Sequence, residues 1–116
     1  MDNAELERLL LDTPAKIKQE ELGLIMLLNV KATNEREIED IEAPIKAEVG
    51  LNCNFKNPEQ RKGAVIKLLN NNPEYQQRVD KQPEYDFAIK KSQTELAYLR
   101  DMFRAYIAIA QMGAKP

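Results

Sequence analysis

The side chains that carry most enzyme chemistry are scarce in this chain, which has no His, no Trp and a single Cys among 116 residues. Without His there is no Ser-His or Cys-His nucleophile pair, no imidazole metal ligand and no side chain that ordinarily titrates near neutral pH. Cys53 on its own forms neither an intrachain disulfide nor a zinc site. Proton transfer and metal binding are therefore left to carboxylates, Lys and Tyr.

Carboxylates are concentrated in one short stretch of the chain. They are Glu35, Glu37, Glu39, Asp40 and Glu42. In a helix Glu39 and Glu42 lie on one face, where two carboxylates can share a hard cation such as Mg²⁺. A metal-dependent hydrolase needs a second acidic pair on a facing helix, but Glu95 is followed three residues later by Tyr98. We interpret the cluster as a solvated helix face and predict no enzyme activity, metal or cofactor.

Basic residues around a predicted helix start form a candidate nucleic-acid contact. They are Lys56, Arg61, Lys62 and Lys67. Three of them surround Asn57, a predicted N-cap, where backbone N–H groups and the helix dipole also favour a phosphate. The net charge of the whole chain is −2 and its isoelectric point is about 5.3, so the general basic footprint of a nucleic-acid-binding protein is absent. Nucleic-acid binding is therefore the alternative interpretation.

The composition indicates one globular domain over residues 1–116, with 43% hydrophobic and 31% charged residues. The longest strongly apolar run, residues 22–28, is far shorter than the roughly 20 residues that span a bilayer. The acidic N-terminus lacks the basic start of a signal peptide. We expect a cytoplasmic protein without membrane contact.

The first half of the chain predicts a long helix preceded by a short one. Asp2 is a good N-cap for a helix over residues 3–11, and Asp12-Thr13-Pro14 predicts a break and a new start. Apolar residues with three-four spacing then predict one helix to about residue 49, interrupted by Lys31 and Asn34 at positions of the apolar stripe. The stripe stays in phase across Pro44, so we expect a kink within one helix there. Its apolar members are Ile17, Leu24, Leu27, Ile38, Ile41, Ile45 and Val49.

The second half predicts three further helices after a loop over residues 50–57. One starts at Pro58 with Asn57 as its cap, and its buried side consists of Ala64, Val65, Leu68 and Leu69. A short helix is expected within residues 70–84, ended by Gln82-Pro83-Glu84. The last helix has a coiled-coil-like seam and should end at Gly113. The seam residues are Tyr85, Ile89, Ser92, Leu96, Leu99, Phe103, Tyr106 and Ala110.

The two long helices are expected to pair. Neither can bury enough apolar surface alone, and no stretch alternates with the period of a strand. Residues 1–49 carry a net charge of −6 and residues 50–116 a net charge of +4, which favours an antiparallel pairing of the two halves. The predicted fold is therefore all-α, a long antiparallel helical hairpin with short additional helices.

Apolar residues remain in surplus after this pairing. Between residues 22 and 28 they point in nearly every direction around the helix, as in a segment that is covered on more than one side. A second subunit is the simplest source of the missing cover, so we expect a homo-oligomer. The candidate self-association residues are Leu22, Leu24, Ile25, Met26 and Leu28.

From about residue 42 to residue 106 the chain resembles small helical proteins of bacteriophages and prophages of Gram-positive bacteria. The motifs that carry the resemblance are Ala43-Pro44-Ile45, Lys56-Asn57-Pro58-Glu59-Gln60-Arg61-Lys62, Asn72-Pro73-Glu74-Tyr75 and Tyr98-Leu99-Arg100. The resemblance implies an accessory protein that binds a phage or host replication or recombination protein, or nucleic acid. It contains no catalytic signature. A non-enzymatic protein-interaction module is the favoured function.

Overall fold

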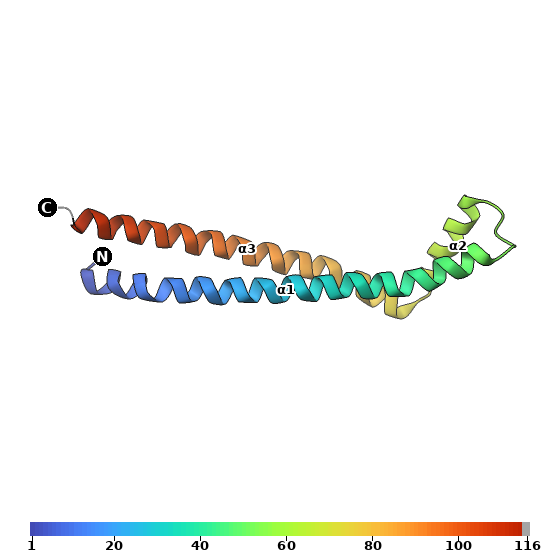
Figure 1. Cartoon of the computed structure of the whole chain (residues 1–116), viewed down its shortest axis with the longest axis horizontal. Coiled ribbons are helices and arrows are strands. Elements are labelled where there is room, and N and C mark those ends of the chain that lie inside the picture. The colour runs from blue at the N-terminus through green and yellow to red at the C-terminus, as the bar shows by residue number, and fades with distance from the viewer. Residues whose placement is uncertain (115–116) are drawn as a thin grey trace. The chain divides into compact units, whose positions relative to one another are not determined.

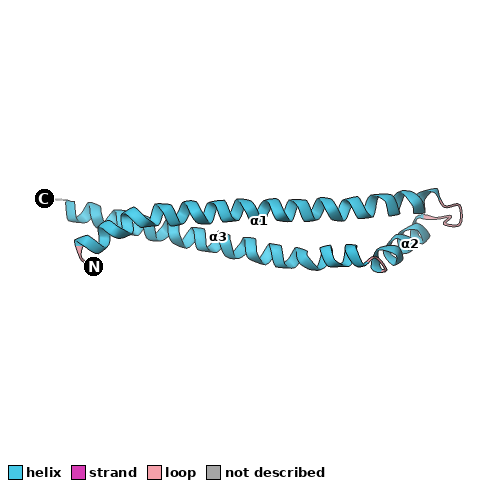
Figure 2. Ribbon diagram, turned by 90° about the horizontal axis from the view of Figure 1, so that it is seen from below, coloured by secondary structure: helices cyan, strands magenta, loops and turns pink. Residues whose placement is uncertain are grey.

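The computed structural model describes residues 1–114 and contains three helices. They are α1 (Asn3–Leu51), α2 (Pro58–Asn70) and α3 (Pro73–Ala114), as Figure 1 shows. Over the described residues every element is a helix, and the connections are short loops (Figure 2). The predicted all-α class, with a long first and a long last helix that pack together, is confirmed.

The predicted helix starts at Asp2 and Asn57 are confirmed by hydrogen bonds, and the Asn72 side chain caps α3 in the same way. Each of these side chains accepts a bond from the backbone N–H three residues later, at 2.7, 2.8 and 3.0 Å respectively. Such bonds satisfy one of the N–H groups that have no partner within the first turn of a helix. The caps therefore set where all three helices begin.

The predicted break at residues 12–14 is wrong, because α1 passes through Pro14 as one helix. The side chains on either side explain why: Leu10 and Ile17 are partly buried and Thr13 is buried, on the face that continues to Leu24. Burial of a stripe that stays in phase opposes the cost of a proline inside a helix, about 3 kcal/mol. The same phase carries α1 through Pro44, where a single helix was predicted.

The predicted break at residues 82–84 is also wrong, because α3 continues through Pro83. The expected short helix within residues 70–84 is the beginning of α3. The stripe there is occupied by Arg78 and Gln82, whose polar bonds to α1 replace apolar contacts. Pro83 is exposed, as Pro14 and Pro44 are, so the carbonyl groups that lose a helical donor lie on the side of the helix that water reaches.

Contacts divide the chain into two compact units. Unit 1 consists of Met1–Leu28 with Phe87–Pro116, and unit 2 consists of Asn29–Asp86. Both long helices pass from one unit into the other, so each unit holds a stretch of α1 and a stretch of α3. The expectation that residues 1–116 form one domain stays a prediction.

Unit 1 is an antiparallel pair of helices. Ile89, Ser92 and Leu96 are buried on the face of α3 that meets α1. The Ser92 hydroxyl donates a hydrogen bond of 2.8 Å to the Glu20 carboxylate. Every member of the predicted α3 seam is buried or partly buried, which confirms the coiled-coil-like spacing.

Unit 2 adds α2 to the second pair of helix stretches. Val49 of α1, at 2% exposure, and Leu69 of α2 are its buried apolar side chains. Ala64 and Val65 are partly buried as predicted. Leu68 was expected on the buried side of α2, but it is 44% exposed. It lines an open hollow against the loop that precedes the helix, so the covered arc of α2 is narrower than the sequence indicates.

Candidate interaction surfaces

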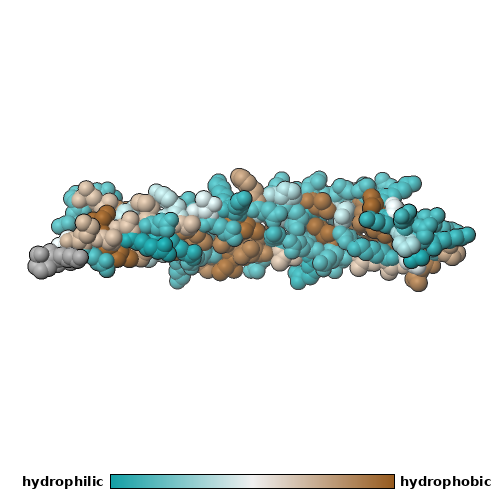
Figure 3. Space-filling view, turned by 90° about the horizontal axis from the view of Figure 1, so that it is seen from above, coloured by the Kyte–Doolittle hydropathy of each residue, from teal (hydrophilic) through white to brown (hydrophobic). Residues whose placement is uncertain are grey.

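Apolar side chains of α1 are exposed in unit 1. Leu22 is 54% exposed and Met26 is 68% exposed, and Ile25 and Leu28 are exposed as well. Leu24, the fifth candidate for self-association, is partly buried because it belongs to the stripe that faces α3. Figure 3 shows hydrophobic residues reaching the surface among hydrophilic ones on the face it draws. Four of the five candidates are therefore accessible within this chain.

One groove of unit 1 runs between α1 and α3 on the side of Gly23. Its lining includes Lys16, Leu22, Gly23, Met26, Glu95 and Leu99, and we call it the Gly23 groove. Apolar side chains of both helices line the groove together with charged ones. Gly23 has no positive φ angle, and a Cβ atom placed on it would meet nothing within 4 Å. The backbone of α1 is therefore open to approach at this point.

A second groove lies on the other side of the same helix pair. Ile25 and Leu96 contribute to its floor. Ile25 is two residues from Gly23, about 200° around the helix, which places the grooves on opposite sides of α1. The Arg100 guanidinium donates a hydrogen bond of 2.9 Å to the Glu21 carboxylate across this groove. Its charges are thus paired within the chain.

The outer face of α3 carries a further exposed row that the sequence analysis missed. Phe87 is 71% exposed, and Tyr98 and Ile109 are also exposed. These residues are 11 positions apart, which is close to three full helical turns. The spacing of 11 residues is a sequence signal for this row. The apolar seam of the same helix gives a stronger periodic pattern, which hides the row.

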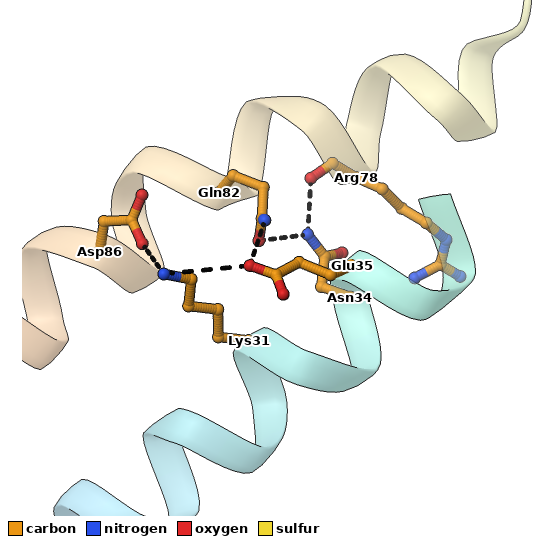
Figure 4. Close-up of polar contacts among 6 residues, drawn as sticks. All are labelled: Lys31, Asn34, Glu35, Arg78, Gln82 and Asp86. Atoms are coloured by element: carbon orange, nitrogen blue, oxygen red, sulfur yellow. Dashed lines mark hydrogen bonds and ion pairs between the residues drawn. The ribbon is translucent and has the colours of Figure 1, made fainter. Parts of the chain in front are cut away.

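A polar cluster in unit 2 joins α1 to α3 (Figure 4). The Asn34 side-chain amide donates to the Arg78 carbonyl at 2.8 Å and to the Gln82 side-chain oxygen at 2.9 Å. Gln82 in turn donates to the Glu35 carboxylate at 3.2 Å. Asn34 is only 3% exposed, so both of its donors are satisfied in a place where water has little access.

Ion pairs extend this polar cluster along both helices. The Lys31 ammonium lies 2.7 Å from the Asp86 carboxylate and 3.9 Å from that of Glu35. The hydrogen bond to Asp86 and its negative charge raise the pKa of Lys31 above the ordinary value, against a smaller opposing effect of desolvation. Arg78 pairs with Glu37 of α1 and with Glu74 of its own helix. The two polar interruptions of the α1 stripe, Lys31 and Asn34, are thus the residues that α3 binds.

The basic candidates do not form one patch. Lys67 lines the hollow beside α2 together with Phe55 and Gly63. Lys62 is five residues earlier, about 140° around the helix axis, and belongs to a different face. The Arg61 guanidinium donates to the Phe55 carbonyl at 3.3 Å. Three of the basic residues therefore lie near the start of α2, whereas Lys67 lies in its last turn.

The predicted phosphate site at the N-terminus of α2 is partly occupied by the chain itself. The Asn57 side chain accepts the Gln60 backbone N–H, and the Gln60 side chain accepts the Lys56 backbone N–H at 2.9 Å. In a capping box the second bond would come from the N–H of the cap residue itself. Here it comes from Lys56, one residue before the cap, so the Asn57 side chain uses one N–H group of the first turn, that of Gln60. An anion at this helix end would have to rely on the basic side chains.

The acidic residues of α1 are dispersed among other partners. Glu42 accepts a hydrogen bond of 3.1 Å from Lys46, whereas Glu39 and Asp40 are exposed. Within residues 1–114 no three acidic or Cys side chains come close enough together to hold a metal ion. Cys53 is exposed in the loop after α1.

Comparisons of the chain with known protein families, with curated proteins and with solved structures found no match. None of the helices within residues 1–114 combines the length and the hydropathy needed to cross a membrane.

Proposed function

We propose that this protein is a non-enzymatic interaction module whose helical scaffold binds another protein through the apolar surface of unit 1. One observation supports the proposal most directly: Leu22 and Met26, about one turn apart on α1, are both exposed, and Ile25 is exposed beside the second groove. Exposed apolar side chains that gather in one segment are typical of protein-protein contact sites. The resemblance to helical phage and prophage proteins favours an accessory role of this kind.

The proposal is tested with variants that add charge to this surface. The tagged full-length chain is used to capture binding proteins, with a second copy of the chain counted as a partner. Leu22→Glu and Met26→Glu should abolish the capture of a specific partner, because burying an unpaired charge is costly. Lys62→Glu is the matched control in unit 2 and should leave capture unchanged.

Circular dichroism shows whether each variant keeps its helix content, which is expected because both positions are exposed. The proposal is wrong if no protein associates with the wild-type chain, or if both charged variants in unit 1 retain the partner in full.

Nucleic-acid binding by unit 2 is the second candidate function. The observation that favours it is the hollow beside α2, where the amine-bearing Lys67 and the ring of Phe55 lie together. A cation beside an aromatic ring is the combination that binds a phosphate and a stacked base of a single strand. The dispersal of the other basic residues limits this candidate to a few contacts.

A further inference from the structure

We propose that the Gly23 groove is a self-docking surface in which a second copy of this chain packs about a two-fold axis. This inference rests on the proposed function, because it names the partner of the same apolar surface. The contact is made in one groove, by one occupant and with one pairing of charges.

Gly23 itself favours a close contact with a second copy of the chain. A glycine inside a helix makes it less stable than alanine by about 1 kcal/mol. Nothing in the described chain requires glycine here, since its φ angle is ordinary and no atom would meet its Cβ within 4 Å. The lack of a side chain instead lets another backbone approach α1 closely. Leu22 and Met26 beside it supply apolar surface for that approach.

The charged side chains that line the Gly23 groove also favour a second copy of the chain. Lys16 and Glu95 both line the groove, and neither has an ion-pair partner among residues 1–114. Because α1 and α3 are antiparallel, Glu95 lies farther from Lys16 along the groove than Leu99 does. A two-fold axis that crosses the groove at right angles to the helices, between the levels of Lys16 and Glu95, therefore brings Lys16 of one copy to the level of Glu95 of the other, twice per dimer.

The small number of helices in unit 1 favours a second copy as well. Unit 1 consists of two helix stretches, so each helix has one neighbour and the grooves on both sides stay open. Helices with apolar stripes must bury them against further elements. A second copy adds two helices and completes a four-helix arrangement, the smallest common bundle. The other groove is less suited to this contact because Glu21 and Arg100 already pair across it.

The charge pairing is tested by sedimentation equilibrium of the full chain, alone and in mixtures. The wild-type chain should be a dimer. Lys16→Glu and Glu95→Lys should each weaken the dimer at least about tenfold, because each creates two like-charge contacts. An equimolar mixture of the two single variants should recover association, since both contacts then join opposite charges. Recovery on mixing requires that the contact be made between chains.

Gly23 gives an independent test with a control of the same kind. Gly23→Ala should raise the thermal midpoint of the dilute chain while weakening the dimer, because the new methyl group occupies the contact. Gly63→Ala in α2 should also favour the helix but leave the dimer unchanged.

The proposal is overturned by a wild-type chain that is monomeric at about 100 µM, by a dimer that none of these substitutions weakens, or by variants that do not recover on mixing. A monomeric chain that still captures a different protein through Leu22 and Met26 overturns the self-docking proposal and leaves the proposed function standing. A chain that associates with no protein at all removes both.

Discussion

Units 1 and 2 contain stretches of the same two helices, yet different chemistry joins them. In unit 1 the buried side chains are Ile89 and Leu96 together with the hydroxyl-bearing Thr13 and Ser92, and the Ser92 hydroxyl donates to Glu20. In unit 2 the contact includes Asn34, which donates to two groups of α3, and Lys31, which pairs with Asp86. Apolar side chains pack in several registers at similar energy, whereas a buried amide is satisfied in one. Unit 2, with its buried amide, therefore fixes the register of α1 and α3 more strictly than unit 1, where Ser92 and Arg100 make the polar contacts between the two helices.

The two units also differ in what they leave exposed. Unit 1 presents Leu22, Ile25 and Met26 on α1, together with the outer row of α3. The surface of unit 2 carries the dispersed basic residues and the hollow beside α2, and its exposed apolar side chains, such as Leu51 and Ile66, lie among them. The comparison predicts that substitutions in unit 1 change stability or protein association, and that substitutions in unit 2 change register or ionic contacts.

The largest effect is expected from Leu96→Ala in unit 1. Leu96 is 3% exposed, and truncating a buried leucine costs about 2 to 5 kcal/mol of unfolding free energy. Leu11→Ala is the matched control, because Leu11 lies in the same unit but is 78% exposed. Urea unfolding at one fixed protein concentration measures both. Equal losses for the two variants would contradict an apolar core in unit 1.

The next effect is expected from Asn34→Asp in unit 2. A carboxylate at this position faces the Arg78 carbonyl and the Gln82 side-chain oxygen, both of which accept the present bonds. Loss of the donors should cost about 1 to 3 kcal/mol. Asn29→Asp introduces the same charge at an exposed position of α1 and should change stability by less than about 0.5 kcal/mol. If the two variants unfold alike, the polar cluster does not specify the pairing.

A smaller effect is expected from alkaline pH. The pKa of Lys31 is raised in the folded chain, so its contribution to stability is complete below the ordinary pKa of about 10.5 and is lost as the pH rises through the folded value. The stability difference between wild type and Lys31→Met should therefore be constant from neutral pH to about 10 and shrink above it. Lys81→Met corrects for the general titration of exposed lysines. A difference that grows with alkalinity would exclude the Asp86 pair as its source.

The smallest effect concerns nucleic acid. Because Lys67 lies on a different face of α2 from Lys62, an oligonucleotide can meet only two or three of the basic residues at once. Any binding should show a log-log salt slope of about −2 to −3, reduced by about one unit in Lys67→Ala and by up to about two units in Arg61→Ala/Lys62→Ala. Fluorescence anisotropy with single-stranded and duplex oligonucleotides measures the slope, and Lys18→Ala in unit 1 serves as control. A slope steeper than about −5 would require a basic surface that unit 2 does not have.

The phase of the apolar stripe predicted more of the fold than local helix signals did. Ile41 and Ile45 stay in phase across Pro44, and a single helix was correctly predicted there. Leu10 and Ile17 are equally in phase across Pro14, but the start signal of Asp12 and Thr13 predicts a break there. A cap signal is a local preference of about 1 kcal/mol, and the burial of a continuous stripe exceeds it.

The helix through Pro83 was not predictable from the apolar pattern. The stripe positions before it are occupied by Arg78 and Gln82, which a search for apolar periodicity counts as interruptions. Their burial depends on the donors of Asn34 and the carboxylate of Glu37, which lie more than 40 residues away. Only the pairing of the two helices makes these polar residues part of a seam.

The sequence predicted the apolar surface of unit 1 better than the arrangement of the basic residues in unit 2. The exposed apolar residues from Leu22 to Leu28 followed from helix geometry alone, because one facing helix covers one side. The arrangement of Lys56, Arg61 and Lys67 depends on the loop after α1, where the Arg61 side chain bonds to the Phe55 carbonyl. Such loop contacts have no periodic signature, so the sequence indicated the basic residues but not their divergence.

The three prolines inside the long helices have a consequence for how the chain opens. Each removes one backbone donor, so the carbonyl groups of Leu10, Asp40 and Val79 have no N–H partner four residues ahead. A helix that lacks a hydrogen bond separates there at lower free energy than elsewhere. Amide hydrogens next to Pro14, Pro44 and Pro83 should therefore exchange with solvent sooner than those at the centre of each intervening stretch. The long helices should therefore unfold locally in segments, and each proline marks where one segment ends and the next begins.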